Sequence, residues 1–131
     1  MPLTLLLLVE DDARQSDALR SLFEESFSDI KVHVAKTLEE AQTHEKNVDA
    51  VLLDLDLPDS HGLSTLTSVL DRFAPVPVIV LTAATDPSIA EQAISLGADD
   101  YLQKALIPPA AIHRVVRYAM RHSRERVAAA E

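Results

Sequence analysis

Apolar residues recur along the chain with two spacings that alternate five times. Three short runs made mostly of Leu, Val and Ile have the length and composition of strands that are buried on both faces, and two shorter segments, one of them with Val32 and Val34 alternating with polar neighbours, complete the set. The predicted strands cover residues 3–9, 32–34, 48–53, 76–81 and 100–103. After each strand, apolar residues three or four positions apart predict an amphipathic helix. The sequence therefore predicts an α/β domain with a doubly wound, five-stranded parallel sheet and five helices.

Local signals mark where several of these helices begin and end. Thr37 and Glu40 have the spacing of a capping box for a short second helix. Asp86, followed by proline, predicts the start of the fourth helix, and Gly97 predicts its end. We expect this helix to face the core through four apolar residues: Ile89, Ala93, Ile94 and Leu96. Two prolines at 108–109 begin the fifth helix.

The pattern changes after residue 120. Residues 121–131 favour helix but contain one large apolar residue, Val127. We therefore divide the chain into a domain over residues 1–120 and a helical extension over residues 121–131, which is either a tail or the start of a linker. Arginines at positions 114, 117, 121 and 124 share a helical face, which is either solvated or part of a connector that dimerises or joins an output domain.

Composition narrows the function mainly by exclusion. The chain has no cysteine, which excludes disulfides, thiolate metal sites and a cysteine nucleophile. Its net charge of −9 argues against nucleic acid as a direct partner of the domain. The first apolar run is too short to cross a membrane and has no basic segment before it, so we expect a soluble, cytoplasmic protein.

Polar side chains follow four of the predicted strands at the point where each strand ends. They are Glu10, Asp11, Asp54, Thr82 and Lys104. Because the carboxyl ends of parallel strands meet at one edge of a sheet, we expect three acids, a hydroxyl and an ammonium group to converge there. This combination predicts a site for a divalent cation and a phosphoryl group.

The chemistry of these residues is specific when they act together. Three neighbouring carboxylates repel one another, and a hard cation such as Mg²⁺ (or Mn²⁺) offsets that cost. Asp54 is the candidate nucleophile, because a carboxylate can form an aspartyl phosphate. Thr82 can donate a hydrogen bond to a phosphoryl oxygen, and Lys104 can place a positive charge beside another. Taken singly, each residue also has an ordinary explanation as a helix cap, a core-edge group or a surface charge.

Four segments resemble the receiver domain of bacterial two-component response regulators, the CheY-like family. They are Leu7–Asp12, Leu52–Pro58 with Gly62, Val80–Ala83 and Gly97–Lys104, in the order and on the elements that this family uses. The resemblance covers roughly residues 4–120. It implies a flavodoxin-like strand order of 2-1-3-4-5.

The resemblance also implies roles for individual residues. Asp54 would accept a phosphoryl group from a histidine kinase or a histidine phosphotransfer protein. Glu10, Asp11, Asp54 and the backbone carbonyl of Asp56 would bind Mg²⁺. Thr82 and Tyr101 would form the switch pair, which changes the surface of the fourth helix, the fifth strand and the fifth helix. That surface is also where a homodimer would form in this family.

Three positions depart from or qualify the family pattern. Proline usually follows the lysine, often after a cis peptide bond, whereas Ala105 follows Lys104. A cis bond there would cost roughly 3 kcal/mol, so either the bond is trans or strain is stored. Asp56 and Ala84 stand at the positions that tune the lifetime of the phosphoryl group in this family, and a small Ala84 would leave the attacking water unobstructed.

Other functions fit parts of the pattern. Asp54 and Asp56 resemble the paired aspartates of haloacid-dehalogenase-type hydrolases, but Pro58 stands where that family has a threonine. A phosphorylation-independent interaction module is a second alternative, which has no need of the complete set of polar residues. The five histidines show no metal-ligand spacing, so we interpret them as surface or structural residues.

Overall fold

The core element is a five-stranded parallel sheet, seen in a computed structural model that describes residues 4–83 and 86–130. The strands are β1 (Thr4–Val9), β2 (Ile30–Ala35), β3 (Ala50–Leu53), β6 (Val78–Thr82) and β7 (Asp100–Gln103). Their order is β2-β1-β3-β6-β7, which confirms the expected flavodoxin-like arrangement. Strands β1 and β3 lie at the centre, so their carboxyl ends stand side by side.

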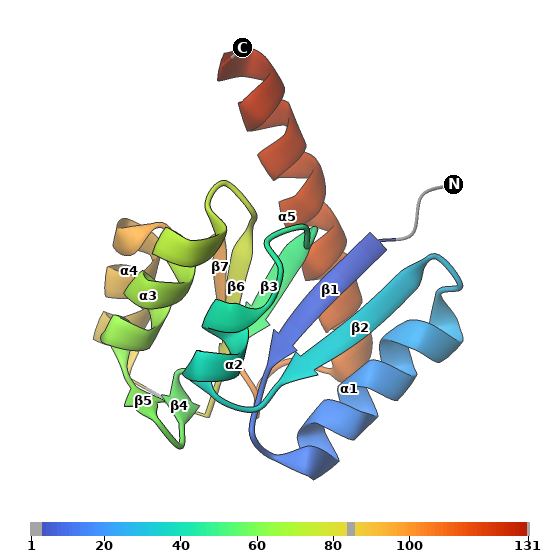
Figure 1. Cartoon of the computed structure of the whole chain (residues 1–131), viewed down its shortest axis with the longest axis horizontal. Helices are drawn as coiled ribbons and strands as arrows, with labels where there is room; N and C mark the ends of the chain where they lie inside the picture. Colours follow the sequence, from blue (N-terminus) through green and yellow to red (C-terminus); the bar gives the residue numbers. More distant parts are fainter. Residues whose placement is uncertain (1–3, 84–85, 131) are drawn as a thin grey trace.

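Five helices cover the two faces of the sheet (Figure 1). Helices α1 (Ala13–Ser26) and α5 (Pro109–Ala130) cover one face, and α2 (Leu38–Thr43), α3 (Leu63–Phe73) and α4 (Pro87–Leu96) cover the other. Alternate residues of β1 point to opposite faces, with Leu6 and Leu8 in the core under α1 and α5 and Leu7 and Val9 in the other core. This double burial explains the near-continuous apolar strands.

The predicted helix ends are present with one adjustment. The Thr37 hydroxyl accepts a hydrogen bond from the Glu40 amide at 3.0 Å, and Asp86 caps α4 by accepting from the Ser88 amide. The adjustment concerns the second half of the motif: Glu40 accepts from the Lys36 amide at 2.6 Å, one residue before the capping residue Thr37, whose own amide a capping box would use. Gly97 ends α4 with a φ of +124°, a conformation that glycine adopts without the cost a side chain incurs.

The prediction of an inward-facing α4 was partly wrong. Ala93 is buried and Ile89 packs against the core, but Ile94 and Leu96 are each 48% exposed. The apolar residues of this short helix extend around more of its circumference than the sheet and α3 cover. Two large apolar side chains therefore stand on the surface.

A small hairpin between β3 and α3 was not predicted. It consists of β4 (Asp56–Leu57) and β5 (Ser60–His61), joined by a turn that contains Asp59. The Asp59 carboxylate accepts hydrogen bonds from the first two amides of α2, at 2.8 and 3.0 Å. The hairpin thus ties the segment that follows Asp54 to the N-terminus of α2.

Helix α5 continues well beyond the sheet (Figure 1). Near the point where it leaves the body, the Ser123 hydroxyl donates to the Pro75 carbonyl at 3.1 Å. Across the described part of the chain, α5 and the other helices lack the combination of length and hydropathy that a membrane span needs. The division at residue 120 stays a prediction.

Candidate functional site

Three consecutive acids at the end of β1 have three different surroundings. Glu10 is buried, with 2% of its surface exposed, whereas Asp11 is exposed. Asp12 caps α1, and its carboxylate accepts from the amides of Arg14 at 2.9 Å and Gln15 at 3.3 Å. Glu10 and Asp11 are therefore left to the site, while Asp12 starts the helix.

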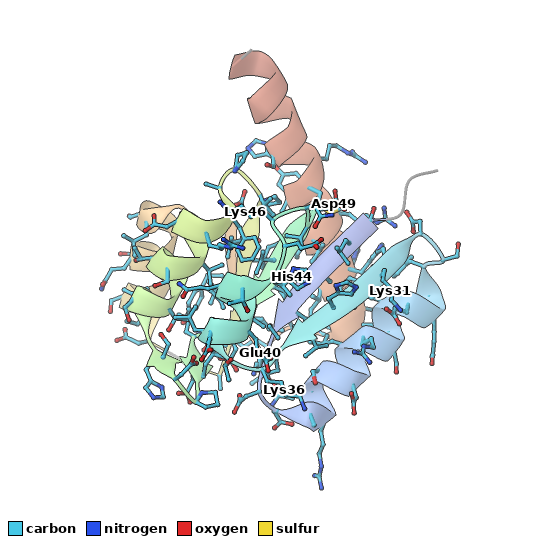
Figure 2. The ribbon with its side chains drawn as sticks, in the orientation of Figure 1. Lys31, Lys36, Glu40, His44, Lys46 and Asp49 are labelled. Carbon is cyan, nitrogen blue, oxygen red and sulfur yellow. The ribbon has the colours of Figure 1, made fainter. Side chains whose placement is uncertain are left out.

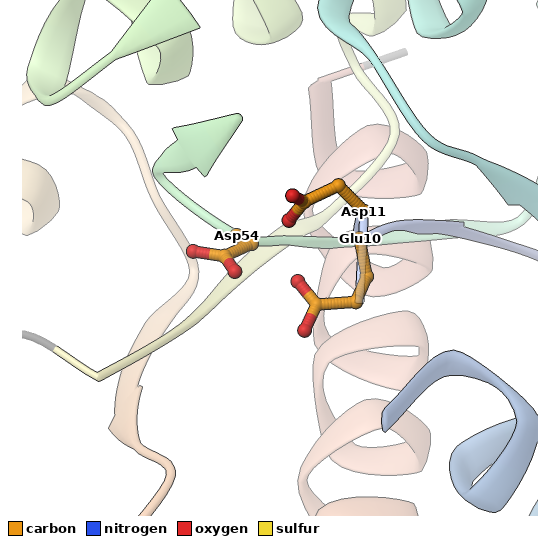
Figure 3. Close-up of side chains that lie close together, drawn as sticks. All are labelled: Glu10, Asp11 and Asp54. Atoms are coloured by element: carbon orange, nitrogen blue, oxygen red, sulfur yellow. The ribbon is translucent and has the colours of Figure 1, made fainter. Parts of the chain in front are cut away.

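Asp54 lies beside these acids because its strand pairs with theirs. Its backbone amide donates to the Val9 carbonyl at 2.9 Å, and one carboxylate oxygen accepts from the Asp56 amide at 3.0 Å. Figure 3 shows the carboxylates of Glu10, Asp11 and Asp54 turned toward a common space. One oxygen from each lies within 4.8 Å of the others, which is the spacing of a cation site.

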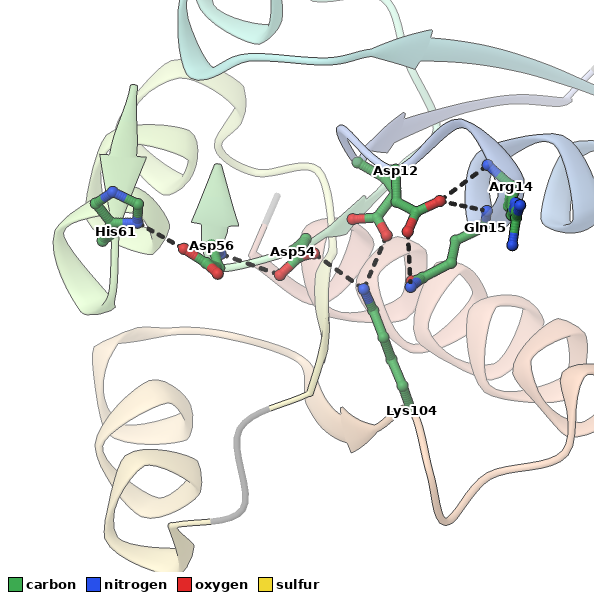
Figure 4. Close-up of polar contacts among 8 residues, drawn as sticks. Asp12, Arg14, Gln15, Asp54, Asp56, His61 and Lys104 are labelled. Atoms are coloured by element: carbon green, nitrogen blue, oxygen red, sulfur yellow. Dashed lines mark hydrogen bonds and ion pairs between the residues drawn. The ribbon is translucent and has the colours of Figure 1, made fainter. Parts of the chain in front are cut away.

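Lys104 reaches this cluster from β7, on the far side of β6. Its backbone amide donates to the Thr82 carbonyl at 2.9 Å, and its ammonium group donates to Glu10 at 2.8 Å and to Asp54 at 2.9 Å (Figure 4). Among the described residues the single cis peptide bond is Ala74–Pro75, so the bond from Lys104 to Ala105 is trans. The absence of the usual proline therefore does not prevent the lysine from reaching both carboxylates.

The charges of this cluster are unbalanced. Burial, followed by the neighbouring Asp54, raises the pKa of Glu10 to about 8, although Lys104 opposes the shift. Burial also opposes ionisation of Asp54, but interactions with Glu10, the Asp56 amide and Lys104 outweigh it and lower the pKa of Asp54. For Lys104, burial is the largest effect and is exceeded by the two acids, so its pKa is raised. One lysine is thus shared by acids that compete for it.

One buried atom of the cluster lacks a partner. Glu10 Oε2 is inaccessible to solvent and accepts no hydrogen bond from any described residue. A buried oxygen without a partner costs roughly 1–3 kcal/mol, more if it is charged. The site therefore has a buried carboxylate oxygen that no described residue uses.

The cluster opens into a cleft of about 850 Å³. Thr82, which is the last residue of β6 and is buried, lines the cleft together with Asp56 and Lys104. Tyr101 is half-buried on β7 and packs against the core; burial and then Asp86 raise the pKa of its hydroxyl, which has no hydrogen-bond partner in the described part of the chain. Ala84 lies outside the described residues.

The sequence did not indicate a contact between Asp56 and His61. These residues face one another across the β4–β5 hairpin, and the His61 Nδ1 atom lies 2.6 Å from an Asp56 carboxylate oxygen (Figure 4). His61 also lines the cleft, so the loop histidine is part of its wall. A predicted turn between Asp56 and His61 would have suggested this contact. The two strands that flank the turn have only two residues each, which is too few to show an alternating pattern.

Comparison with known proteins agrees with this geometry. The family model for the response regulator receiver domain matches residues 6–117. The KDP operon transcriptional regulatory protein KdpE of Escherichia coli (strain K12) is 38% identical over 106 residues, which cover 78% of this chain and 45% of KdpE. The DNA-binding response regulator MtrA of Mycobacterium leprae is 34% identical over 110 residues, covering 84% and 48%. The chain therefore spans about half the length of these curated relatives.

Solved structures extend the likeness to the whole fold. The receiver domain of the Francisella response regulator 1452 superposes with a TM-score of 0.79 at 25% identity, and the match covers 92% of this chain and 98% of that one. The segment that the family model matches, residues 6–117, contains all five strands of the sheet except the first two residues of β1. On the strength of the family match, the shared strand order and the acidic edge, this chain belongs to the receiver domains of two-component response regulators.

Proposed function

We propose that the protein is a phosphoacceptor switch of a two-component phosphorelay, in which Asp54 receives the phosphoryl group. The observation that supports this most directly is the surroundings of Asp54. Its carboxylate, 8% exposed and with a lowered pKa, stands at the mouth of an open cleft between the Asp56 amide and Lys104. An ionised carboxylate needs no general base, so it is ready to act as a nucleophile.

The transfer itself is simple in chemical terms. An Asp54 oxygen forms a bond to phosphorus while the bond from phosphorus to the donor's histidine nitrogen breaks. The imidazole keeps the electron pair of the broken bond. The donor is a histidine kinase or a histidine phosphotransfer protein, and loss of the phosphoryl group to water resets the switch.

The acidic cluster fits Mg²⁺ (or Mn²⁺). Its donors are carboxylate oxygens, the ligands that hard cations prefer, and the unpartnered Glu10 Oε2 supplies an oxygen that nothing else uses. Glu10, Asp11, Asp54 and the backbone carbonyl of Asp56 would hold the ion. When bound, it would neutralise charge on the phosphoryl oxygens.

The remaining residues bind and report the phosphoryl group. The Lys104 ammonium group exchanges one of its hydrogen bonds to a carboxylate for a hydrogen bond to a phosphoryl oxygen. The Thr82 hydroxyl donates to another phosphoryl oxygen. Tyr101, whose ring already packs against the core, completes the switch pair. Asp56 and Ala84 tune how long the phosphoryl group survives.

The output surface is formed by α4, β7 and α5. Exposed Ile94 and Leu96 give α4 the apolar area that a regulated contact or a homodimer needs. Because the relatives KdpE and MtrA are described as transcriptional and DNA-binding regulators, we propose a downstream output protein or domain. This domain itself does not bind nucleic acid, acts in the cytoplasm and is no enzyme beyond its own phosphorylation and dephosphorylation.

Intact-mass analysis after incubation with acetyl phosphate tests the proposal. With Mg²⁺ we expect a gain of about 80 Da, the mass of one phosphoryl group. The gain should vanish without Mg²⁺ and in Asp54→Asn, and should persist in Asp71→Asn, an exposed acid on α3. Circular dichroism should show that Asp54→Asn remains folded.

Two results would contradict the proposal. The first is an adduct that survives Asp54→Asn, which would place the acceptor elsewhere. The second is the absence of both adduct and released phosphate in the presence of Mg²⁺. Turnover of small phosphomonoesters would instead favour a haloacid-dehalogenase-type hydrolase, and an inert Asp54 would favour a phosphorylation-independent module.

A further inference from the structure

Two histidines on different elements meet at the edge of the sheet where β2 lies. His33 lies on β2, the edge strand, and His44 is the residue at which α2 ends. The Nδ1 atom of His33 is 3.0 Å from the Nε2 atom of His44, and the rings meet edge to face. Their separation of eleven residues along the chain matches no ligand motif, so the fold alone brings them together.

The His44 ring is held in one orientation by its surroundings. Its Nδ1 atom lies 2.9 Å from the Glu45 carbonyl, which can only accept, so Nδ1 carries a hydrogen and, in the neutral ring, Nε2 has the lone pair. The backbone of His44 is fixed as well, because its carbonyl accepts from Arg72 at 2.8 Å. Metal-binding histidines usually donate their second ring nitrogen to a carbonyl or carboxylate in this way.

We propose that His33 and His44 form a binding site for a divalent transition-metal ion that favours imidazole, such as Zn²⁺, Ni²⁺ or Cu²⁺. Imidazole nitrogens suit these ions, and water or an external ligand completes the coordination. Two Zn–N bonds of about 2.0–2.1 Å at a tetrahedral angle place the nitrogens roughly 3.3 Å apart, a few tenths of an ångström from the arrangement present. To bind the ion, His33 must carry its hydrogen on Nε2 instead of Nδ1, and both rings must turn so that the two lone pairs converge on the ion rather than along the present hydrogen bond.

The site is accessible and is chemically distinct from the acidic cleft. His33 is exposed and His44 is half-buried, so an ion reaches them from solvent. Figure 2 shows His44 at the end of α2, in front of the sheet. The pair offers nitrogen donors, which Mg²⁺ does not favour, while the cleft offers oxygens. A bound ion would join the edge strand to the end of α2.

Histidine-selective ¹H–¹⁵N NMR during a Zn²⁺ titration tests this inference. Mg²⁺ is kept in large excess, so that the acidic cleft is occupied by its own cation. With the first equivalent of Zn²⁺ we expect the ring nitrogens of His33 and His44 to shift together, while those of His61 stay in place. The thermal midpoint should rise with Zn²⁺ concentration, since the ion binds the folded form.

Matched variants separate the pair from other histidines. His33→Gln and His44→Gln should each abolish the Zn²⁺-dependent rise in thermal midpoint. His61→Gln, in the wall of the cleft, and His122→Gln, exposed on α5, should retain it.

The inference is overturned if the first equivalent shifts His61 and leaves His33 and His44 unchanged, because the ion then belongs to the cleft. Zn²⁺ binding that survives both substitutions in the pair would overturn it equally. The NMR experiment on the unaltered chain stands even if a variant is unstable. Asp54 labelling is independent of this test, so the two proposals fail separately.

Discussion

Two groups of charged side chains, one in the acidic cleft and one where α5 meets the loop before β2, have their charges matched to different degrees. In the acidic cleft, Glu10 and Asp54 share Lys104, with Asp11 close by. In the contact between α5 and the loop before β2, one arginine meets one acid: Arg117 donates to both carboxylate oxygens of Asp29, at 2.8 and 3.0 Å.

The rest of this α5 contact is equally complete. Arg117 Nε lies 3.0 Å from His113 Nε2, and the His113 ring stacks on Phe27 with centroids 3.4 Å apart. Nothing in the contact calls for a further group, whereas the cleft has a buried oxygen without a partner. The difference teaches that matched charge serves architecture here, and that the unmatched charge lies at the site where we propose that the cation and the phosphoryl group bind.

Removing the lysine should have the largest effect. Lys104→Met leaves two largely buried carboxylates without their cation, and we expect a loss of about 2–4 kcal/mol in the free energy of unfolding without Mg²⁺. The loss should be greatest above pH 8, where Glu10 is ionised. Urea denaturation at several pH values measures it, with the exposed Lys36→Met as the charge-matched control. A loss no greater than that of the control would mean that the cluster is well solvated.

Glu10→Gln should act in the opposite direction. A carboxyl whose pKa is raised from 4.5 to about 8 on folding makes the metal-free protein less stable as pH rises through that interval. Gln imitates the protonated form, so we expect the variant to gain at least about 1 kcal/mol above pH 8. Thermal unfolding from pH 5 to pH 9 checks this, and Mg²⁺ should stabilise the wild type more than the variant. A parallel pH dependence in the two proteins would contradict the assignment of the slope to Glu10.

Arg117→Met should produce a smaller loss. The ion pair is about one-third exposed on each side, so we expect a loss well below that of Lys104→Met. The effect should be the same with and without Mg²⁺, because the contact lies apart from the cleft. Urea denaturation of the variant with and without Mg²⁺ measures it. A loss that depends on Mg²⁺ would show that the two regions are coupled and would break the comparison.

The smallest effect should come from His113. Burial, and then Arg117, lower its pKa, although Asp29 opposes the shift. The contribution of His113 to the free energy of unfolding is therefore complete above pH 6.5, the unperturbed pKa of histidine, and declines as the pH falls below that value. This pH dependence has the opposite sign to that expected from Glu10. The thermal midpoints of wild type and His113→Gln should diverge slightly between pH 7 and pH 5. An NMR titration that gives His113 a pKa above 6.5 would contradict the sign.

The sequence was most informative where burial is complete. The runs that became β1, β3 and β6 are apolar at nearly every position because both faces are covered, so their existence and the convergence of Glu10, Asp54 and Lys104 followed from pattern and topology. The limits of the elements were less accurate. Thr82 is the last residue of β6 rather than the residue after it.

It was least informative where contacts join distant or very short segments. Exposed Ile94 and Leu96 have the same spacing as buried residues, and periodicity does not reveal what covers a helix. The β4–β5 hairpin is too short to show alternation, so the contact of Asp56 with His61 could not be foreseen. The trans bond after Lys104, by contrast, agrees with local composition, because the residue that follows is alanine and not proline.

Helix α5 also has a mechanical consequence. The hydrogen bond from Ser123 to Pro75 lies where the helix leaves the body of the domain, so it can act as a pivot. The seven helical residues after Ser123 extend roughly 10 Å beyond it, at 1.5 Å per residue. If the helix pivots there as a rigid rod by about 10°, its last described residue moves by roughly 2 Å. Small rearrangements of the packing beneath α5 would thus reach its far end as displacement, a form of signal that needs no change in the helix itself.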